Sequence, residues 1–296
     1  LIKNFKKNKC VGVEPCLNLA KITKRKGYKT FNNYWNSKTA EIIKKEFKLF
    51  DMIYSANTIT HIDDLNEVFS SIFKILSNDG ILIIEDPSLL ECIKKVSYDQ
   101  FYNEHIYVFS ALALRNILKK HNLEIFDIEN LKTHGGSIRY YIKKKINKKF
   151  QIKKKVSKQI KCELTNGLNK YDTYKKFALK ANFSKNKLLS IFKNIKDNKK
   201  IIIGYGATAK ATTVLNFCNI DNKLINYFVD TTPDKQNKFM PGKNIKIYQY
   251  NKNLIKKVDY IFLGAWNFKD EIFSKEKDFI KNGGKFITHI PYPKIL

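Results

Sequence analysis

The sequence predicts an α/β protein with two doubly wound, Rossmann-like units joined by a helical segment. Strand-like apolar runs alternate with amphipathic helical stretches in the first 145 residues and again after residue 199. Between them, residues 150–197 are rich in Lys and poor in Gly and Pro, which favours helix. Such alternation is typical of a parallel sheet with helices on both faces. The 296 residues are enough for two full cores.

Each element of the first unit has its own sequence signal. Gly27 is a natural cap for a first helix, an apolar face runs from Leu65 to Ile75, and Pro87 closes a strand. In chain order we expect a strand at 9–14, a helix at 16–26, a strand at 50–57, a helix at 63–76, a turn at 78–80, a strand at 81–87, a helix at 110–121, and antiparallel edge strands at 123–131 and 136–144.

The second unit repeats the pattern on a smaller scale. Its strands are expected within 200–217, 224–230, 258–266 and 283–291. The domain boundaries that follow are 1–145, 146–198 for the helical linker, and 199–296. The chain enters its first strand with no glycine-rich turn before it, so we expect an N-terminal part to be missing.

Composition limits the classes of function. The net charge is +29, but the basic residues are almost all Lys, and they are spread along the chain with Asn and Ile. Biased genomic composition explains this pattern, so we expect no nucleic-acid partner. No run of about 18 apolar residues is present, so we expect no membrane span. Five scattered Cys without CxxC spacing predict no metal site in this chain and suit the cytoplasm.

Polar residues follow the predicted strands of the first unit, where open α/β sheets bind ligands. Glu14 ends the first strand, a place where an acid accepts the hydroxyls of a ribose. The alternative is an acid that interacts with a helix dipole. Asn57 and His61 follow the second strand, and His61 is either a ligand-facing or a surface residue.

The segment "YNEH" places Tyr102, Glu104 and His105 within four positions. A carboxylate near a histidine raises its basicity and fixes its tautomer, and a tyrosine can donate to a developing oxyanion. The segment therefore predicts proton abstraction, although a helix entry with a surface Glu and a buried Tyr explains it as well. The loop "THGGSIRYY" (133–141) adds a double glycine, which allows close approach to a substrate, and Arg139, which suits a phosphate.

The segment "GYGATAKA" (204–211) follows a strand and opens a helix, and Asp230 ends the next strand. This spacing resembles the dinucleotide fingerprint and supports an alternative function, an NAD(P)-dependent oxidoreductase. Lys210 at the start of that helix instead suits a diphosphate.

Taken in order, these blocks resemble the sugar C-methyltransferases that act on nucleotide-linked 4-keto-deoxysugars. The resemblance rests on "VGVEPCLNLAKITKRKG", the block from "FDMIYSAN" to "ILIIE", "FYNEHIYVFS", "THGGSIRYY", "IIGYGATAKATTVLNF", "YFVDTTPDKQNKFMPGKNI" and "AWNFKDEI". It implies a class I methyltransferase Rossmann-like domain that binds S-adenosylmethionine, followed by a second, smaller Rossmann-like domain for the sugar nucleotide. It implies zinc only in an N-terminal domain that this sequence lacks, together with the first strand and glycine-rich loop of the methyltransferase fold.

The resemblance also implies roles for individual residues. His105 would remove a proton from a carbon next to the ketone, expected to be C3, with Tyr102, Glu104 and His61 as catalytic partners. Glu14, Pro15 and Asn57 would bind the cofactor. The substrate-binding residues would be His134, Gly135, Gly136, Ser137, Arg139, Gly204, Tyr205, Gly206 and Lys210.

Overall fold

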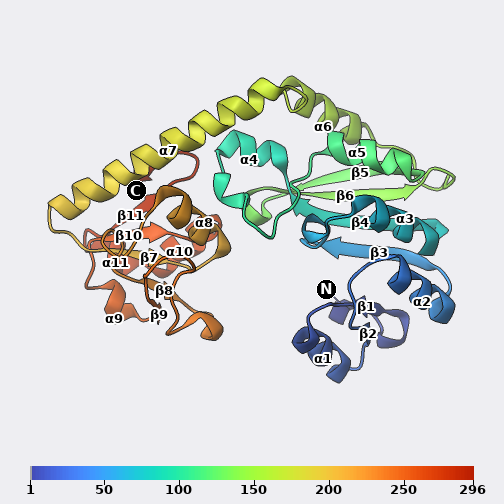
Figure 1. Cartoon of the computed structure of the whole chain (residues 1–296), viewed down its shortest axis with the longest axis horizontal. Helices are drawn as coiled ribbons and strands as arrows, with labels where there is room; N and C mark the ends of the chain where they lie inside the picture. Colours follow the sequence, from blue (N-terminus) through green and yellow to red (C-terminus); the bar gives the residue numbers. More distant parts are fainter. Residues whose placement is uncertain (1) are drawn as a thin grey trace. The chain divides into compact units, whose positions relative to one another are not determined.

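The computed structural model describes residues 2–296, and of Ile2 and Asn8 it describes the backbone only. The chain forms two compact units (Figure 1). Unit 1 comprises the residues up to Glu85 together with Ala111–Glu129 and Arg139–Lys158. Unit 2 comprises Asp86–Ser110, Asn130–Ile138 and Gln159–Leu296. Unit 2 therefore includes two segments that lie within the expected first domain, and the linear boundaries at 145 and 198 stay a prediction.

Unit 1 contains a two-stranded parallel sheet, in which β1 (Val11–Val13) pairs with β2 (Lys29–Phe31). Helix α1 (Leu17–Arg25) connects the two strands and ends before Gly27, whose φ is +85°. The expected strand at 9–14 and helix at 16–26 are confirmed.

A second sheet of unit 1 has the order β3-β4-β6-β5. Strands β3 and β4 run parallel, with Met52 opposite Ile81 and Ala56 opposite Glu85. The apolar face of α3 is buried, and α3 packs against both α2 and α5. The bounds are α2 Ser37–Phe47, β3 Phe50–Ala56, α3 Leu65–Ile75, β4 Leu76–Pro87, α5 Ala111–Lys120, β5 Leu123–Leu131 and β6 Ser137–Lys144.

Two expectations for this sheet are wrong. The turn at 78–80 is part of β4, because Phe50 pairs with Leu76 and Met52 with Ile81, so residues 77–80 bulge from a continuous strand. Strand β6 is not an edge strand, since it lies between β4 and β5. The two strands do run in opposite directions, because Lys145 after β6 donates its N–H to the carbonyl of Asn122 before β5 (2.9 Å).

The basic run 143–155 packs on carboxylates of unit 1. Lys143 pairs with Glu124 at 2.9 Å, and Lys153 and Lys155 both pair with Asp127, at 2.6 and 2.9 Å. These contacts hold the run against β5 and lead into helix α6 (Lys154–Thr165).

Unit 2 is built on a six-stranded sheet of order β12-β11-β10-β7-β8-β9. Its strands are parallel except for the short β12, which runs antiparallel to β11. The α/β alternation expected after residue 199 is confirmed, with β9 and β12 added. The bounds are α4 Leu89–Lys95, α7 Tyr171–Asp197, β7 Ile202–Tyr205, α8 Ala209–Cys218, β8 Phe228–Asp230, β9 Ile247–Gln249, α9 Lys252–Ile255, β10 Tyr260–Leu263, α10 Lys269–Lys275, α11 Lys277–Lys281, β11 Lys285–Thr288 and β12 Lys294–Ile295.

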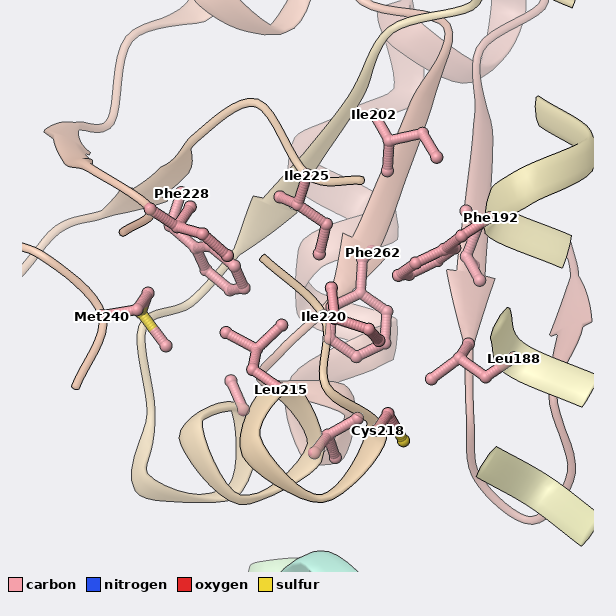
Figure 2. Close-up of a cluster of buried hydrophobic side chains, with 14 of the residues drawn as sticks. Leu188, Phe192, Ile202, Leu215, Cys218, Ile220, Ile225, Phe228, Met240 and Phe262 are labelled. Carbon is pink, nitrogen blue, oxygen red and sulfur yellow. The ribbon is translucent and has the colours of Figure 1, made fainter. Parts of the chain in front are cut away.

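Unit 2 has two core clusters; one lies between this sheet and the helices α7 and α8, with α7 packed against β7 and α8 (Figure 2), and the other includes Ile272 of α10 and Phe279 of α11. Phe192 of α7 meets Phe262 of β10 edge to face, with ring centroids 5.7 Å apart. The long helical segment expected at 150–197 is confirmed as α6 and α7, and its apolar side contributes to this core.

The order of strands places a topological switch point in unit 2. From β7 the chain passes to β8 and β9 on one side, and then crosses to β10 and β11 on the other. The carboxyl ends of β7 and β10 therefore lie side by side, and open α/β sheets bind ligands at such a place.

Short 3-10 turns carry several of the polar residues that follow. They are η1 Ile2–Asn4, η2 Lys7–Lys9, η3 Ile59–His61, η4 Tyr98–Gln100, η5 Thr133–Gly135, η6 Pro233–Lys235 and η7 Trp266–Phe268. Within residues 2–296, none of the helices combines the length and the apolar character that crossing a bilayer requires.

Candidate active site

The expected site residues fall into two groups, one in each unit, and each group is described by itself. In unit 2, His105 and Tyr102 form a close pair. The Tyr102 hydroxyl lies 2.6 Å from Nε2 of His105, and the ring centroids are 4.0 Å apart. The backbone N–H of His105 donates to the carbonyl of Tyr102 (2.8 Å), so a tight turn brings the two rings together. Both side chains are half-buried.

The other ring nitrogen of His105 defines its tautomer. Nδ1 lies 2.8 Å from the main-chain carbonyl oxygen of Gln100. A carbonyl oxygen can only accept, so Nδ1 carries a proton, and in the neutral imidazole Nε2 accepts from the Tyr102 hydroxyl. The expected orienting group was the carboxylate of Glu104. The group at Nδ1 is a backbone carbonyl, and an orienting role for the Glu104 carboxylate stays a prediction.

The charge near Tyr102 keeps its hydroxyl protonated. Burial raises the pKa of Tyr102, and the carboxylates of Glu104 and Asp99 raise it further. At neutral pH the phenol is therefore a hydrogen-bond donor. The Glu104 side chain is exposed, and its negative charge is one cause of the raised pKa of Tyr102.

The double-glycine loop of unit 2 has an unusual backbone. His134, Gly135 and Gly136 have φ values of +53°, +88° and +129°. A Cβ on Gly135 would lie 2.2 Å from Cη2 of Trp266, and one on Gly136 would lie 2.7 Å from Cγ of Glu91. Glycine is therefore needed both for the backbone angles and for close packing.

Hydrogen bonds hold this loop through its carbonyl oxygens. The carbonyl of His134 accepts from Nε2 of Gln100 (2.8 Å) and from Nζ of Lys210 (2.9 Å), and the carbonyl of Gly135 accepts from Lys95. The buried Ser137 donates its hydroxyl to the carbonyl of Thr133 (3.1 Å). The loop is thus fixed by its main chain, while the His134 side chain is exposed.

Lys210 is expected to meet a diphosphate, which stays a prediction, and the structure gives the ammonium partners within unit 2. The residue is 8% exposed, and its ammonium bonds the carbonyl of His134 and lies 5.1 Å from the ring centroid of Trp266. Burial lowers the pKa of Lys210, partly offset by Asp99 and Cys92. Lys210 therefore connects α8 to the double-glycine loop inside the protein.

The remaining residues of "GYGATAKA" also serve packing. Tyr205 is buried in the cluster on the α10 and α11 side of the sheet and donates to Oε1 of Glu276 (3.1 Å), and its expected contact with substrate stays a prediction. A Cβ on Gly204 would lie 2.3 Å from the ring of Phe228, and one on Gly206 would lie 2.6 Å from Cβ of Ala265. Both glycines are required by neighbouring side chains of the same unit.

Asp230 bears on the oxidoreductase alternative. In a dinucleotide site the acid at the end of this strand receives ribose hydroxyls. Here its Oδ2 accepts from the N–H of Ala207 (2.7 Å) and its Oδ1 from the N–H of Thr232 (2.8 Å). Asp230 is 8% exposed and stabilises the turn itself, which argues against a dinucleotide at this position.

In unit 1, Glu14 follows β1 at its carboxyl end. It is half-buried, and Oε1 accepts from the N–H of Cys16 (2.9 Å), while the neighbouring Pro15 is exposed. The amide of Asn32 donates to the carbonyls of Glu14 and Pro15 (2.9 Å each), which fixes the turn between strand and helix. A carboxylate held at the end of a strand suits the hydroxyls of a ribose.

Asn57 and His61 lie beyond the carboxyl end of β3. Asn57 has a φ of +49°, and its N–H donates to the carbonyl of Glu85 (2.8 Å). His61 ends the turn η3, and its side chain is exposed. The sharp turn at Asn57 directs the chain away from the sheet.

Arg139 was expected to bind a substrate phosphate, and unit 1 holds it between two carboxylates. Its Nη2 pairs with Glu85 and its Nη1 with Glu129, each at 2.9 Å, and Nε also donates to Glu85 (3.1 Å). The bonded tyrosine Tyr141 and the carboxylate of Glu85 raise the pKa of Arg139. Both carboxylates therefore partner Arg139 within the sheet, and the expected phosphate contact stays a prediction.

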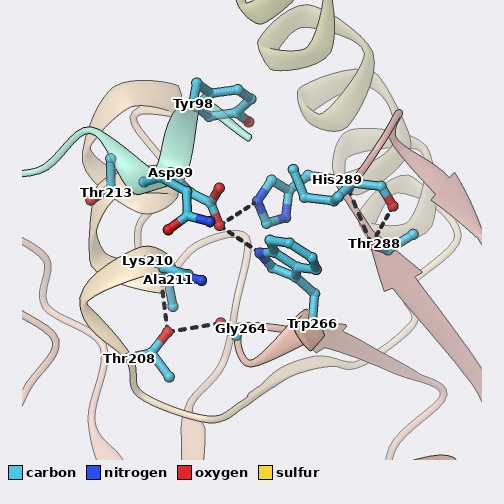
Figure 3. Close-up of polar contacts among 12 residues, drawn as sticks. Tyr98, Asp99, Thr208, Lys210, Ala211, Thr213, Gly264, Trp266, Thr288 and His289 are labelled. Atoms are coloured by element: carbon cyan, nitrogen blue, oxygen red, sulfur yellow. Dashed lines mark hydrogen bonds and ion pairs between the residues drawn. The ribbon is translucent and has the colours of Figure 1, made fainter. Parts of the chain in front are cut away.

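The sequence interpretation missed a buried polar cluster around Asp99 in unit 2 (Figure 3). The carboxylate of Asp99 accepts from Nε1 of Trp266 (2.6 Å) and lies 3.2 Å from Nε2 of His289. Asp99 and His289 are 0% and 1% exposed. Burial alone raises the pKa of Asp99, but His289, Lys210 and Trp266 outweigh it and hold that pKa below its usual range.

Comparison with known proteins agrees with this architecture. Residues 1–128 match a family model described as a methyltransferase domain, and residues 132–291 match one described as the C-methyltransferase C-terminal domain. The chain is 30% identical over 286 residues to the C-methyltransferase NovU of Streptomyces niveus, which covers 97% of this chain and 68% of NovU. The fold and these matches define a class I methyltransferase that uses S-adenosylmethionine. Within that class, the chain belongs to the C-methyltransferase family.

Solved structures include more distant methyltransferases. One from Thermotoga maritima is 22% identical, covers 44% of this chain and 71% of its own, and has a TM-score of 0.33. One from Clostridium acetobutylicum is 16% identical, covers 48% and 77%, and has a TM-score of 0.35. These overlaps are too limited to support a conclusion about this chain.

Proposed function

We propose that this C-methyltransferase transfers the methyl group of S-adenosylmethionine to a carbon next to the ketone of a nucleotide-linked 4-keto-deoxysugar. The expected carbon is C3. One observation carries the proposal, namely that His105 presents Nε2 as a hydrogen-bond acceptor to the Tyr102 hydroxyl while a carbonyl holds the proton on Nδ1. A base, Nε2 of His105, and a hydrogen-bond donor, the Tyr102 hydroxyl, thus lie 2.6 Å apart.

In forming an enolate, His105 acts as the base and Tyr102 as the hydrogen-bond donor to the oxygen. A proton on a carbon next to a ketone is too weakly acidic to leave without a base. Nε2 of His105 takes this proton. The imidazolium that forms is stabilised by the hydrogen bond that Nδ1–H donates to the carbonyl of Gln100. The Tyr102 hydroxyl turns from Nε2 to the ketone oxygen and donates to the charge that develops there. One such donor contributes about 3 kcal/mol in acyl-transfer enzymes.

The residues of unit 1 fit the cofactor at its ribose end. The carboxylate of Glu14 follows β1 at its carboxyl end, on a turn held by Asn32. Carboxylates accept hydrogen bonds from the two hydroxyls of a ribose, and Pro15 and Asn57 are proposed to complete this surface. S-adenosylmethionine, when bound, supplies an electrophilic methyl group for the carbon nucleophile.

The substrate class rests on the sequence resemblance and on the chemistry of the pair. A base beside a phenol suits a ketone with an acidic neighbouring carbon. The proposed substrate contacts are the exposed His134 side chain and the half-buried Gly135, whereas Gly136 is buried and already uses its N–H and carbonyl within unit 2. His61, on the turn η3 of unit 1, stays a predicted catalytic partner.

The test follows proton exchange without a methyl donor. The protein is incubated in heavy water with a thymidine diphosphate 4-keto-6-deoxysugar, and loss of the C3 proton is followed by NMR. We expect His105→Gln to slow exchange by about a hundred- to ten-thousandfold. His121→Gln is the matched control, because His121 lies at the end of α5 and contacts Asn66. Equal exchange by His105→Gln and wild type, with both folded and binding the sugar nucleotide, contradicts the role of His105.

A further inference from the structure

The switch point of unit 2 is occupied by two segments of the chain itself. Trp266 follows β10, and Lys210 lies in the first turn of α8, directly after β7. Trp266 contacts the loop at Gly135 and donates to Asp99, and Lys210 donates to the carbonyl of His134. The place where a Rossmann unit normally binds a ligand is therefore filled by the turn η4 and the double-glycine loop.

Within that arrangement, the three residues of η4 have separate anchors. Tyr98 packs against His289 and Phe217, with ring centroids 5.7 and 5.1 Å away. Asp99 is anchored by Trp266 and His289. All three residues of the turn are at most 6% exposed. The turn is thus a rigid, buried part of unit 2.

Gln100 links this rigid turn to the reacting pair. Its side-chain amide donates to the carbonyl of His134 (2.8 Å), and its main-chain carbonyl accepts from Nδ1 of His105 (2.8 Å). The residue is 2% exposed. One residue therefore contacts both the double-glycine loop and the histidine ring.

We propose that Gln100 is the positioning residue of the reaction and that Asp99, through Trp266 and His289, anchors it. Gln100 holds its carbonyl at Nδ1 of His105, which keeps the Nδ1–H tautomer and directs Nε2 toward the substrate. The second Rossmann-like unit then acts as the rigid support of the base. This inference rests on the proposed function only for its effect on rate, because the tautomer can be measured without substrate.

The test uses the full chain with ring-¹⁵N-labelled histidine. The nitrogen chemical shifts separate the two tautomers, and His105→Gln assigns the His105 signals among the five histidines. The Tyr102 hydroxyl also favours Nδ1–H, so the comparison is made in a Tyr102→Phe background. We expect Tyr102→Phe to retain Nδ1–H, and Tyr102→Phe with Gln100→Leu to show a mixture of tautomers.

Rate and stability controls complete the test. Gln100→Leu alone is expected to slow C3 proton exchange about ten- to a hundredfold with little change in KM, because a small displacement of the base costs rate rather than binding. Gln159→Leu, which removes an amide bond to Glu163 in the same unit, is expected to keep the wild-type tautomer and rate. Where Gln100→Leu does not fold, Trp266→Phe removes the donor to Asp99 and is expected to give the same mixture in the Tyr102→Phe background.

The outcomes separate this inference from the proposed function. Retention of pure Nδ1–H in the folded double variant overturns the positioning role of Gln100. Normal proton exchange in His105→Gln overturns the proposed function, whereas the tautomer result with Gln100 still stands on its own. A mixture of tautomers together with the rate loss supports both.

Discussion

Gly135 and Gly283 offer a matched pair that tests whether the double-glycine loop is seated on Trp266. Their φ values are nearly equal, +88° and +85°. A Cβ on Gly283 meets nothing within 4 Å, whereas a Cβ on Gly135 would lie 2.2 Å from Cη2 of Trp266. Substitution by Ala therefore imposes the same backbone strain at both sites and a steric clash at only one.

The magnitudes follow from these two terms. Left-handed backbone costs an alanine about 1 kcal/mol relative to glycine, so Gly283→Ala is expected to destabilise unit 2 by about 1 kcal/mol. Gly135→Ala adds overpacking against a ring that is itself bonded to Asp99, which costs about 1–3 kcal/mol more. The expected difference between the two variants is therefore about 2 kcal/mol.

Urea unfolding measures this difference through tryptophan fluorescence. The chain has two tryptophans, so a Trp35→Phe background leaves Trp266 as the only reporter, and it lies in unit 2. Gly135→Ala is also expected to change the native fluorescence, since the ring must move. Equal unfolding free energies for the two alanine variants, with unchanged native fluorescence, would refute the seating of the loop on Trp266.

Three further predictions concern charged groups. Lys210→Met is expected to destabilise unit 2 by about 1–2 kcal/mol and to change KM for the sugar nucleotide less than about tenfold. The control is Lys281→Met, at an exposed position. A larger rise in KM with Lys210→Met alone would show that Lys210 contacts the substrate. Because the folded pKa of Asp99 is lowered, its contribution to stability is complete above its unfolded pKa and is lost as pH falls through the folded pKa. Asp99→Asn should therefore lower the free energy of unfolding by about 3 kcal/mol at pH 7 and weaken its dependence on pH in acid. The same slope of unfolding free energy against pH in variant and wild type below about pH 4 would contradict this. In unit 1, Glu85 and Glu129 both pair with Arg139, but the Glu85 side chain is 10% exposed and that of Glu129 46%. Thermal unfolding should therefore show a loss of about 2 kcal/mol for Glu85→Gln and below about 1 kcal/mol for Glu129→Gln. Equal losses would contradict the buried pairing of Glu85.

The sequence predicted much of the alternation of elements from local signals, but β2, α2 and α4 were not predicted. The helix α3 follows from its apolar spacing, and the end of α1 follows from Gly27. The turn predicted at 78–80 was wrong for a physical reason. Its residues favour a turn, but pairing of β4 with β3 on both sides keeps them in the strand as a bulge.

The site was predicted in part. The spacing of Tyr102 and His105 was enough to bring them together, since a single turn joins them. The orienting group was missed because it is a main-chain carbonyl, which no residue pattern marks. The anchor of Asp99 was missed because Trp266 lies 167 residues away. For Lys210 and Arg139, the sequence shows a cation and only the fold shows the partner that neutralises or buries it.

The most direct test of the central claim follows the transferred methyl group itself. The full chain is given ¹³C-methyl-labelled S-adenosylmethionine and a nucleotide-linked 4-keto-6-deoxysugar, with His105→Gln as the comparison, and the product is examined by NMR. Our account predicts label bonded to the ring carbon next to the ketone, and none with His105→Gln. Label on an oxygen or nitrogen, or equal transfer by the His105 variant, would contradict it.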